Sequence, residues 1–122
     1  MPIKNDSVKE RLIYVMELEG GNFYIGQTVE HIAKRVRKHF MGKGSAWTKA
    51  HAPKSVKKVI NIGLLTYTEA EQIENEYVIQ YMKKYGWEKV RGGFFTLVDE
   101  EQHLKTLRGH QRLNKVNGID FI

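Results

Sequence analysis

The chain has 122 residues, contains no cysteine and carries a formal net charge of +6 at pH 7. This length suits a single domain, and the missing cysteines exclude disulfides, thiolate zinc sites and cysteine nucleophiles. The hydrophobic fraction of 41% and the lack of a long apolar run predict a folded, soluble protein of the cytoplasm.

Basic residues concentrate in the middle of the chain. No Asp or Glu occurs between His31 and Thr68, although this stretch holds nine Lys and Arg residues. Such a block is typical of a surface that binds a polyanion, and nucleic acid is the interpretation that we favour. An acidic protein partner and an ordinary solvated face are the alternatives.

The N-terminal third predicts a β-hairpin. Residues 1–10 are polar and are expected to form a flexible arm. In "RLIYVMELEG", Tyr14 and Met16 alternate with Ile13 and Val15, so both faces of the predicted strand are apolar. "EGGN" is typical of a turn, and "NFYIGQT" is predicted to return as the second strand.

A basic helix is predicted to follow the hairpin. In "EHIAKRVRKHF", Ile32, Val36 and Phe40 recur every four residues and are expected to face the core. Arg35 and His39 are also four residues apart, so they share another face of this helix. "GKGSAWTKAHAPKS" is interpreted as a loop, and "VKKVINIGLLTY" as a third strand.

The second half of the chain predicts two further helices. "TEAE" matches a capping box, with Thr68 at the cap and Glu71 three residues later, and the helix is predicted to end near Tyr85. "WEKVRGGFF" is interpreted as a connector rich in turns. "DEEQHLKTLRG" predicts a last short helix, on which His103 is expected to lie at the surface. The element order predicts an α+β fold, with a small three-stranded antiparallel sheet flanked by helices.

Five sequence elements occur in an order that resembles the GIY-YIG nuclease family. They are "LIY" at 12–14, "YIG" at 24–26, the helix "QTVEHIAKRVRKH", the loop "GKGSAWTKAHAP", and the glutamate helix with its following "VRGG" in "EAEQIENEYVIQYMKKYGWEKVRGG". The likeness is to the small stand-alone members of viral or phage type. It implies a nuclease domain at 11–95, preceded by the arm 1–10 and followed by a helical extension at 96–122 that packs on the same domain.

The resemblance also implies roles for five side chains. Tyr14 would contact the attacking water or act as its general base, and Tyr24 would hold the scissile phosphate or the water. Arg35 would stabilise charge on the phosphate. His39 would support Tyr14 or take up a proton. Glu74 would bind one divalent ion, Mg²⁺ or Mn²⁺, beside the leaving oxygen.

The sequence departs from the family pattern at three points. Leu12 replaces the first glycine of the first triplet. The spacing from Thr28 to Arg35 is one residue longer than usual, and the distance to His39 favours Arg35 over Arg37. Lys89 stands where many viral-type members have asparagine before "VRGG".

The metal-binding glutamate has two candidates. Glu74 and Glu76 lie about 200° apart around one helix, so only one of them can face a given site. Glu74 neighbours the apolar face formed by Ile73 and Tyr77, which favours it as the inward-pointing carboxylate. Glu76 is the alternative.

The basic block also suggests the residues that contact DNA. Trp47 is either a core anchor or part of a DNA-facing loop that stacks on a base. The expected contacts are Lys38, Lys43, Ser45, Trp47, Thr48, Lys49, Lys54, Lys89 and Arg91.

The resemblance implies a metal-dependent endonuclease that hydrolyses DNA phosphodiester bonds by direct attack of water. It would be a monomer or weak dimer, with no membrane partner, and a phage or virus could encode it. A non-catalytic DNA-binding or regulatory module on the same fold is the main alternative. A restriction-type nuclease with a defined site is another, and RNA is an open alternative as substrate.

Overall fold

The computed structural model describes residues 7–29 and 31–122, so residues 1–6 of the predicted arm lie outside the described residues. The first strand begins at Lys9, two residues before its predicted start. In chain order the elements are β1 (Lys9–Leu18), η1 (Glu19–Gly21), β2 (Asn22–Thr28), α1 (Ile32–Phe40), α2 (Ala46–Ala50), β3 (Pro53–Leu65), α3 (Tyr67–Tyr85), η2 (Trp87–Lys89), β4 (Val90–Gly92) and α4 (Glu100–Leu113).

The predicted α+β class is confirmed, but the sheet is four-stranded and mixed. Its strand order is β3-β1-β2-β4. β1 pairs antiparallel with both β2 and β3, whereas β4 pairs in parallel with β2, with Phe23 opposite Val90. The prediction of a three-stranded antiparallel sheet is therefore wrong. β4 has only three residues, which is too short to show the alternation that predicts a strand.

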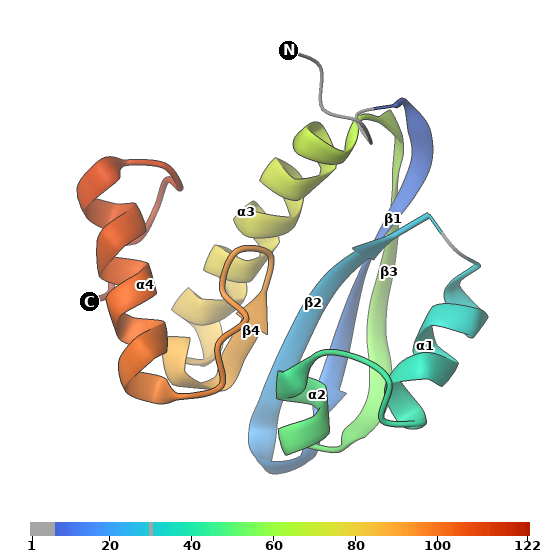
Figure 1. Ribbon diagram of the computed structural model, residues 1–122, viewed down its shortest axis with the longest axis horizontal. Coiled ribbons are helices and arrows are strands. Elements are labelled where there is room, and N and C mark those ends of the chain that lie inside the picture. The colour runs from blue at the N-terminus through green and yellow to red at the C-terminus, as the bar shows by residue number, and fades with distance from the viewer. Residues whose placement is uncertain (1–6, 30) are drawn as a thin grey trace.

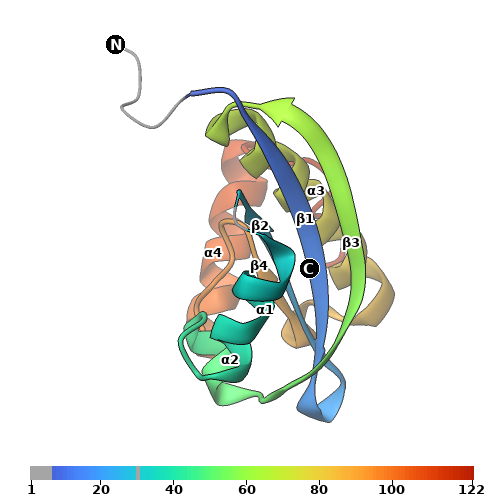
Figure 2. The same cartoon turned by 90° about the vertical axis from the view of Figure 1, so that its right-hand side faces the viewer.

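Helices cover both faces of this sheet. In Figures 1 and 2, α1 and α2 lie against one face and α3 lies against the other, with α4 beyond it. Ile13 and Val15 of β1 belong to the core on the α3 side. Tyr14 and Met16 belong to the smaller cluster on the α1 side. The predicted central strand, apolar on both faces, is confirmed, and it places Tyr14 beneath α1.

The segment between β2 and β3 differs from its prediction in two ways. Ile32 and Val36 pack against the Tyr14 cluster as expected, but Phe40 is 52% exposed because it sits at the end of α1. The predicted loop contains the five-residue helix α2, capped by the Ser45 hydroxyl, which accepts from the Thr48 amide. A helix this short has no periodicity that could reveal it.

The capping box of α3 lies two residues earlier than predicted. Thr66 caps the helix and exchanges hydrogen bonds with Glu69, in place of the predicted pair Thr68 and Glu71. Both pairs fit the same sequence motif. The earlier one is used because β3 ends at Leu65, which leaves Thr66 in the extended conformation that a cap requires.

The C-terminal extension packs on the domain through α4. Asp99 caps this helix by accepting from the Gln102 amide, and Leu107 is buried in the main core. His103 is also fully buried, so its predicted surface position is wrong. Its side chain contacts the Trp87 and Phe95 rings. Within the described part of the chain, no helix is long and apolar enough to cross a membrane.

The burial of His103 predicts an acid-sensitive fold. Burial, with a further contribution from the Arg91 charge, lowers the pKa of His103 from its usual 6.5 to about 4. Between these values the unfolded chain binds more protons than the folded one, so stability falls as the pH falls through this window. We expect His103 to account for a loss on the order of 2 kcal/mol.

Urea unfolding of the protein and of His103→Gln, between about pH 7.5 and pH 4.5, measures this effect. The variant should show a weaker loss of stability with falling pH. Glu74 makes the opposite contribution to the pH dependence of stability, because burial raises its pKa to about 7. Both proteins contain Glu74, so this contribution is the same in each of them. Equal slopes for the two proteins would contradict the assignment to His103.

Candidate active site

Tyr14 lies at the floor of the site, directly beneath β2. It is paired with Gly26 across the hairpin and is fully buried. A side chain at Gly26 would overlap the Tyr14 hydroxyl and ring. The glycine of "YIG" is therefore needed for close approach, because the phenol of the neighbouring strand fills the space where a Cβ would stand.

Two side chains of α1 hold the Tyr14 hydroxyl. The Tyr14 oxygen lies 2.8 Å from Nε2 of His39 and accepts a hydrogen bond from Nε of Arg35 at 3.1 Å. Burial and the nearby Arg35 charge lower the pKa of His39 to about 4, so its imidazole is neutral at pH 7. Burial raises the pKa of Tyr14 above its usual range. The phenol is therefore protonated and placed next to a neutral base.

Tyr24 stands beside this group on β2. Its ring centroid lies 6.2 Å from that of Tyr14 and 5.2 Å from that of His39. Its hydroxyl makes hydrogen bonds with Ser45 and Arg35. Burial, followed by the charge of Glu74, raises the pKa of Tyr24. Tyr24 is thus a neutral phenol that joins the α1 side chains to the carboxylate of α3.

Glu74 closes the opposite wall of the site from α3. It is 6% exposed and lines a cleft of about 410 Å³ together with Tyr24 and Arg35. Its carboxylate accepts hydrogen bonds from the backbone amides of Gln27 and Gly93. Burial is the main reason that its pKa is raised to about 7, and these amides partly oppose the shift. The result is a buried carboxyl group that is oriented by two backbone amides and lines the cleft.

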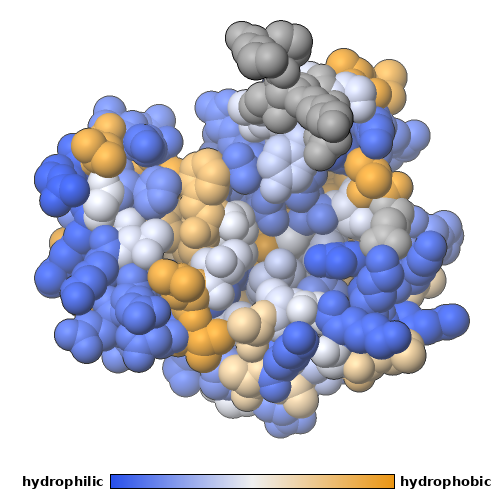
Figure 3. All heavy atoms as spheres, viewed as in Figure 1, coloured by the Kyte–Doolittle hydropathy of each residue, from blue (hydrophilic) through white to orange (hydrophobic). Residues whose placement is uncertain are grey.

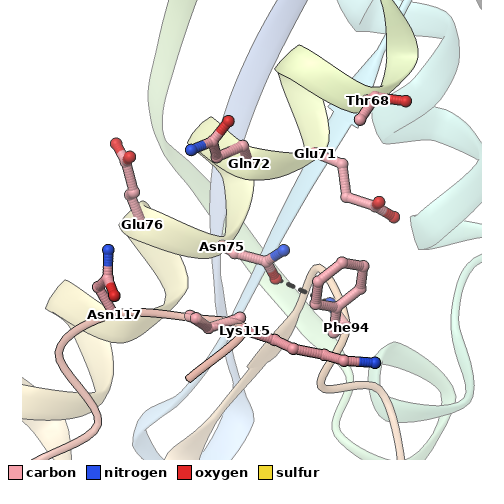
Figure 4. A pocket seen from close by; sticks show the side chains of 9 residues that line it. Thr68, Glu71, Gln72, Asn75, Glu76, Phe94, Lys115 and Asn117 are labelled. Carbon is pink, nitrogen blue, oxygen red and sulfur yellow. Dashed lines mark hydrogen bonds between the residues drawn. The ribbon is translucent and has the colours of Figure 1, made fainter. Parts of the chain in front are cut away.

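Glu76 points to a different part of the molecule. It is exposed and lines a separate hollow of about 190 Å³ between α3 and the C-terminal segment. Figure 4 shows this hollow, with Asn75 and Phe94 at its centre and the Asn75 oxygen bonded to the Phe94 amide. Of the two candidate glutamates, only Glu74 lies with Tyr24 and Arg35.

The order of these residues along the chain agrees with one protein family. The GIY-YIG catalytic domain matches residues 10–86. This chain belongs to the GIY-YIG family. A UPF0213 protein of Bacillus cereus is 36% identical over 76 residues, which cover 58% of this chain and 78% of that relative. No solved structure matches the chain at a significant level.

The GIY-YIG cleft offers one carboxylate to a metal ion. Among the described residues there is no group of three or more His, Cys, Asp and Glu side chains that could hold a metal. Such a site does not suit zinc, which needs three or four protein ligands. It does suit Mg²⁺, which keeps several waters and binds through one or two carboxylates and the phosphate of a substrate.

Three of the predicted DNA contacts are buried and have no surface to offer to DNA. Trp47 donates from its indole nitrogen to the Phe23 carbonyl at 2.9 Å, so it is a core anchor. Thr48 is 2% exposed and contacts His39. Arg91 is 1% exposed and donates to backbone carbonyls on both sides of it in the chain. These burials correct the three assignments, because an internal partner satisfies each polar group.

The remaining predicted contacts keep some surface. Lys43, Lys49 and Lys89 are exposed, and hydrophilic side chains gather over α1 in Figure 3. Lys54 is exposed too, but its ammonium lies 3.3 Å from the Glu17 carboxylate. Lys38 and Ser45 are half-buried. These positions stay predictions, with Lys54 the least available because it already has an ion-pair partner.

Arg11, Gln27 and Tyr67 line the cleft but were not among the predicted site residues. Arg11 reaches the cleft from β1, its guanidinium bonded to the Leu65 carbonyl at 2.8 Å and to the Gln27 side chain at 3.3 Å. Tyr67 completes this wall from the first turn of α3, and its ring lies 5.8 Å from the Arg11 guanidinium. No local pattern marks these residues, because β1, β2 and α3 come together there only in the fold.

Substituting Gly26 is expected to damage the site without unfolding the protein. In Gly26→Ala, the new methyl group must displace the Tyr14 hydroxyl, which breaks its contacts with His39 and Arg35. We expect a loss of about 1–3 kcal/mol in the free energy of unfolding, as for other overpacked cores.

Gly109→Ala is the matched control for this prediction. Gly109 lies inside α4 with open space around it, so a methyl group there should raise stability by about 0.5–1 kcal/mol. Urea unfolding compares the two variants. Equal changes in the two would show that Gly26 is not needed for the approach of Tyr14.

Proposed function

We propose that this GIY-YIG protein is an endonuclease that hydrolyses DNA phosphodiester bonds with one divalent metal ion, Mg²⁺ or Mn²⁺. The observation that carries this proposal is that Tyr24, Arg35 and Glu74 line one cleft, while Tyr14 lies buried behind it and is hydrogen-bonded to Arg35 and His39. Hydrolysis of a phosphodiester needs a proton acceptor for water, a cation for the phosphate charge and stabilisation of the leaving oxygen. The cleft supplies a group for each need.

Tyr14 is the proposed first acceptor of the water proton. Water enters next to the Tyr14 oxygen and passes its proton to that oxygen as it attacks phosphorus. The phenol proton moves at the same time to Nε2 of His39, 2.8 Å away. The P–O bond to the leaving group then breaks, and the leaving oxygen takes a proton from solvent. No covalent bond to the enzyme forms in this sequence.

The two pKa shifts favour a concerted transfer over a resting tyrosinate. The pKa of Tyr14 is raised above its usual 10, whereas that of His39 is about 4. A separated tyrosinate–imidazolium pair would therefore cost about 8 kcal/mol or more. Moving the water proton onto Tyr14 as the phenol proton leaves avoids that pair, and the Nε proton of Arg35 stabilises the charge on the oxygen during the transfer.

Arg35 and Glu74 handle the charges on the substrate. Arg35 lines the cleft, where its guanidinium can bind the non-bridging oxygens of the phosphate. Glu74 would hold the metal ion, which would neutralise charge on the leaving oxygen when bound. The backbone amides of Gln27 and Gly93 keep that carboxylate in one orientation.

The basic stretch 31–68, which contributes Arg35 to the cleft, favours nucleic acid as substrate. The stretch 31–68 contains no acidic residue, and Lys43 and Lys49 are exposed in the part of this stretch that leads into and through α2. Their charges would bind the phosphate backbone irrespective of base sequence. We therefore expect weak sequence preference and cleavage that weakens steeply with added salt.

Cleavage of supercoiled plasmid, branched DNA and single-stranded RNA tests the proposal. We expect the protein with Mg²⁺ or Mn²⁺ to nick or cut DNA, and EDTA to abolish the activity. Salt-sensitive binding to DNA without cleavage of any of the three substrates would instead support a non-catalytic DNA-binding module. A fixed set of fragments from a long DNA would support a restriction-type enzyme, and cleavage of RNA alone would change the substrate class.

A further inference from the structure

Thr48 has a position that its expected role in DNA binding does not explain. It lies on the buried side of α2, and its hydroxyl oxygen is 3.2 Å from Nδ1 of His39. This contact is on the opposite edge of the imidazole from the Tyr14 hydroxyl. Thr48 is therefore the second partner of the histidine that the proposed mechanism uses as the final proton acceptor.

The hydrogen bonds around Thr48 define which atom carries the proton. Its hydroxyl donates to the Ser45 carbonyl at 2.9 Å, closer than its distance to His39. The Thr48 oxygen thus has its own proton engaged and presents a lone pair to the ring. The contact between the Thr48 oxygen and Nδ1 of His39 therefore needs a donor on the histidine, and only a protonated Nδ1 supplies it. With the imidazole neutral, Nε2 is then the unprotonated nitrogen.

The opposite tautomer would conflict with its neighbours. A proton on Nε2 would make the Tyr14 oxygen accept from both His39 and Arg35, so that no lone pair would be left for the attacking water. The Thr48 hydroxyl would also have to leave the Ser45 carbonyl in order to donate to Nδ1. That arrangement loses the hydrogen bond from Thr48 to the Ser45 carbonyl. It also leaves the Tyr14 hydroxyl proton without an acceptor, because Nε2 of His39 would itself be protonated.

Gly44 keeps this contact closed to other partners. A side chain at Gly44 would overlap both Nδ1 of His39 and the Thr48 oxygen. The backbone passes near the ring and His39 is only 1% exposed, and Thr48 is the only side-chain hydrogen-bond partner of Nδ1 among the described residues. The Nδ1 edge of the imidazole is thus held by α2 and the Gly44 backbone.

We propose that Thr48 is a positioning residue that fixes His39 in the tautomer with the proton on Nδ1. Nε2 then accepts from Tyr14, and a directed chain runs from Arg35 through Tyr14 and His39 to Thr48 and the Ser45 carbonyl. The structural part of this proposal stands alone, whereas its catalytic consequence rests on the proposed nuclease function. Thr48 itself touches neither water nor phosphate in this scheme.

The tautomer can be read without any substrate. Long-range ¹H–¹⁵N spectra of protein labelled with ¹⁵N-histidine distinguish the two neutral forms, and the His39 signals are assigned by their loss in His39→Gln. We expect His39 to carry its proton on Nδ1 at neutral pH. A proton on Nε2 in the unaltered protein would overturn the proposal, whether or not the protein cleaves DNA.

Two substitutions of Thr48 test its part in this choice. Thr48→Val keeps the shape but removes the acceptor, so a buried Nδ1–H would lose its partner and the Nε2–H form should appear. Thr48→Ser keeps the hydroxyl and should keep the Nδ1–H form. Thr106→Val removes the hydroxyl of a threonine on α4 that bonds only within its own helix, so it should leave His39 unchanged.

Kinetics then connect the tautomer to cleavage. We expect Thr48→Val to lower kcat by about 10–100-fold with KM within about 2-fold, and Thr48→Ser to restore kcat to within about 3-fold. A Thr48→Val protein that keeps the Nδ1–H form and full kcat would overturn the proposal. A protein that shows the expected tautomers in all variants but cleaves nothing would preserve the role of Thr48 and reject the nuclease function.

Discussion

Glu74→Gln is expected to lower metal-dependent cleavage by about 1000-fold, the largest change in activity that a single substitution should produce here. The amide keeps the shape of the side chain, so folding should be little affected. It removes the charge from the one carboxylate that lines the cleft with Tyr24 and Arg35. Glu74 is the one Asp or Glu among the residues that line this cleft, so the cleft has no second carboxylate of its own to take its place.

Glu76→Gln is the matched control, since it makes the same change two residues away on the same helix. Glu76 lines the hollow beside Phe94 and not the cleft, so its cleavage rate should stay within about 2-fold of the unaltered protein. Plasmid nicking and Mn²⁺ titration of both variants measure the effect. Loss of activity in Glu76→Gln alone would reject Glu74 as the metal-binding residue.

Arg91→Ala is expected to give the largest loss of stability, about 3–5 kcal/mol. The Arg91 guanidinium is buried and donates to the carbonyls of Trp87, Glu88, Val90, Leu97 and Val98. It also lies 4.0 Å from the centre of the Trp47 ring. Truncation leaves these carbonyls without their donor and opens a cavity between β4, α2 and the segment that leads to α4.

Lys89→Ala separates this structural role from DNA binding. Lys89 is exposed, and its ammonium donates a hydrogen bond to the Gly20 carbonyl at 3.2 Å. Its removal should change stability by less than about 0.5 kcal/mol. Urea unfolding and DNA binding at a temperature where both variants are folded make the comparison. If Arg91→Ala kept full stability and lost affinity for DNA, the buried position of Arg91 would be refuted.

The position of Glu74 could be predicted from the sequence, whereas the burial of Arg91 and Thr48 could not. The apolar helix face beside Glu74 predicts that it points inward, and in the structure Glu74 lines the cleft. The direction of a helical side chain follows from local periodicity. Arg91 and Thr48, which are predicted from the sequence to be among the DNA contacts, are buried, because burial depends on tertiary packing and not on how basic or polar a side chain is.

The amino-acid sequence alone determined the order of the hairpin, the basic helix and the glutamate helix, together with the chemical groups of the site. Apolar residues that alternate, or that recur every four residues, indicate these elements. Such a pattern is visible within a segment of about ten residues, so it needs no knowledge of the fold. The family relationship over residues 10–86 agrees with these elements. The central position of β1, with Tyr14 and Ile13 on opposite buried faces, also follows from alternation alone.

Only the tertiary structure decided the pairing of β4 with β2, the wall formed by Arg11 and Tyr67, and the contact of Thr48 with His39. Each depends on segments that are distant in sequence or too short to have a period. Their positions are set by how the core packs and by which buried polar groups can satisfy one another. The same packing buries Arg91, so its guanidinium donates to backbone carbonyls and not to the DNA phosphates that its charge had suggested as partners.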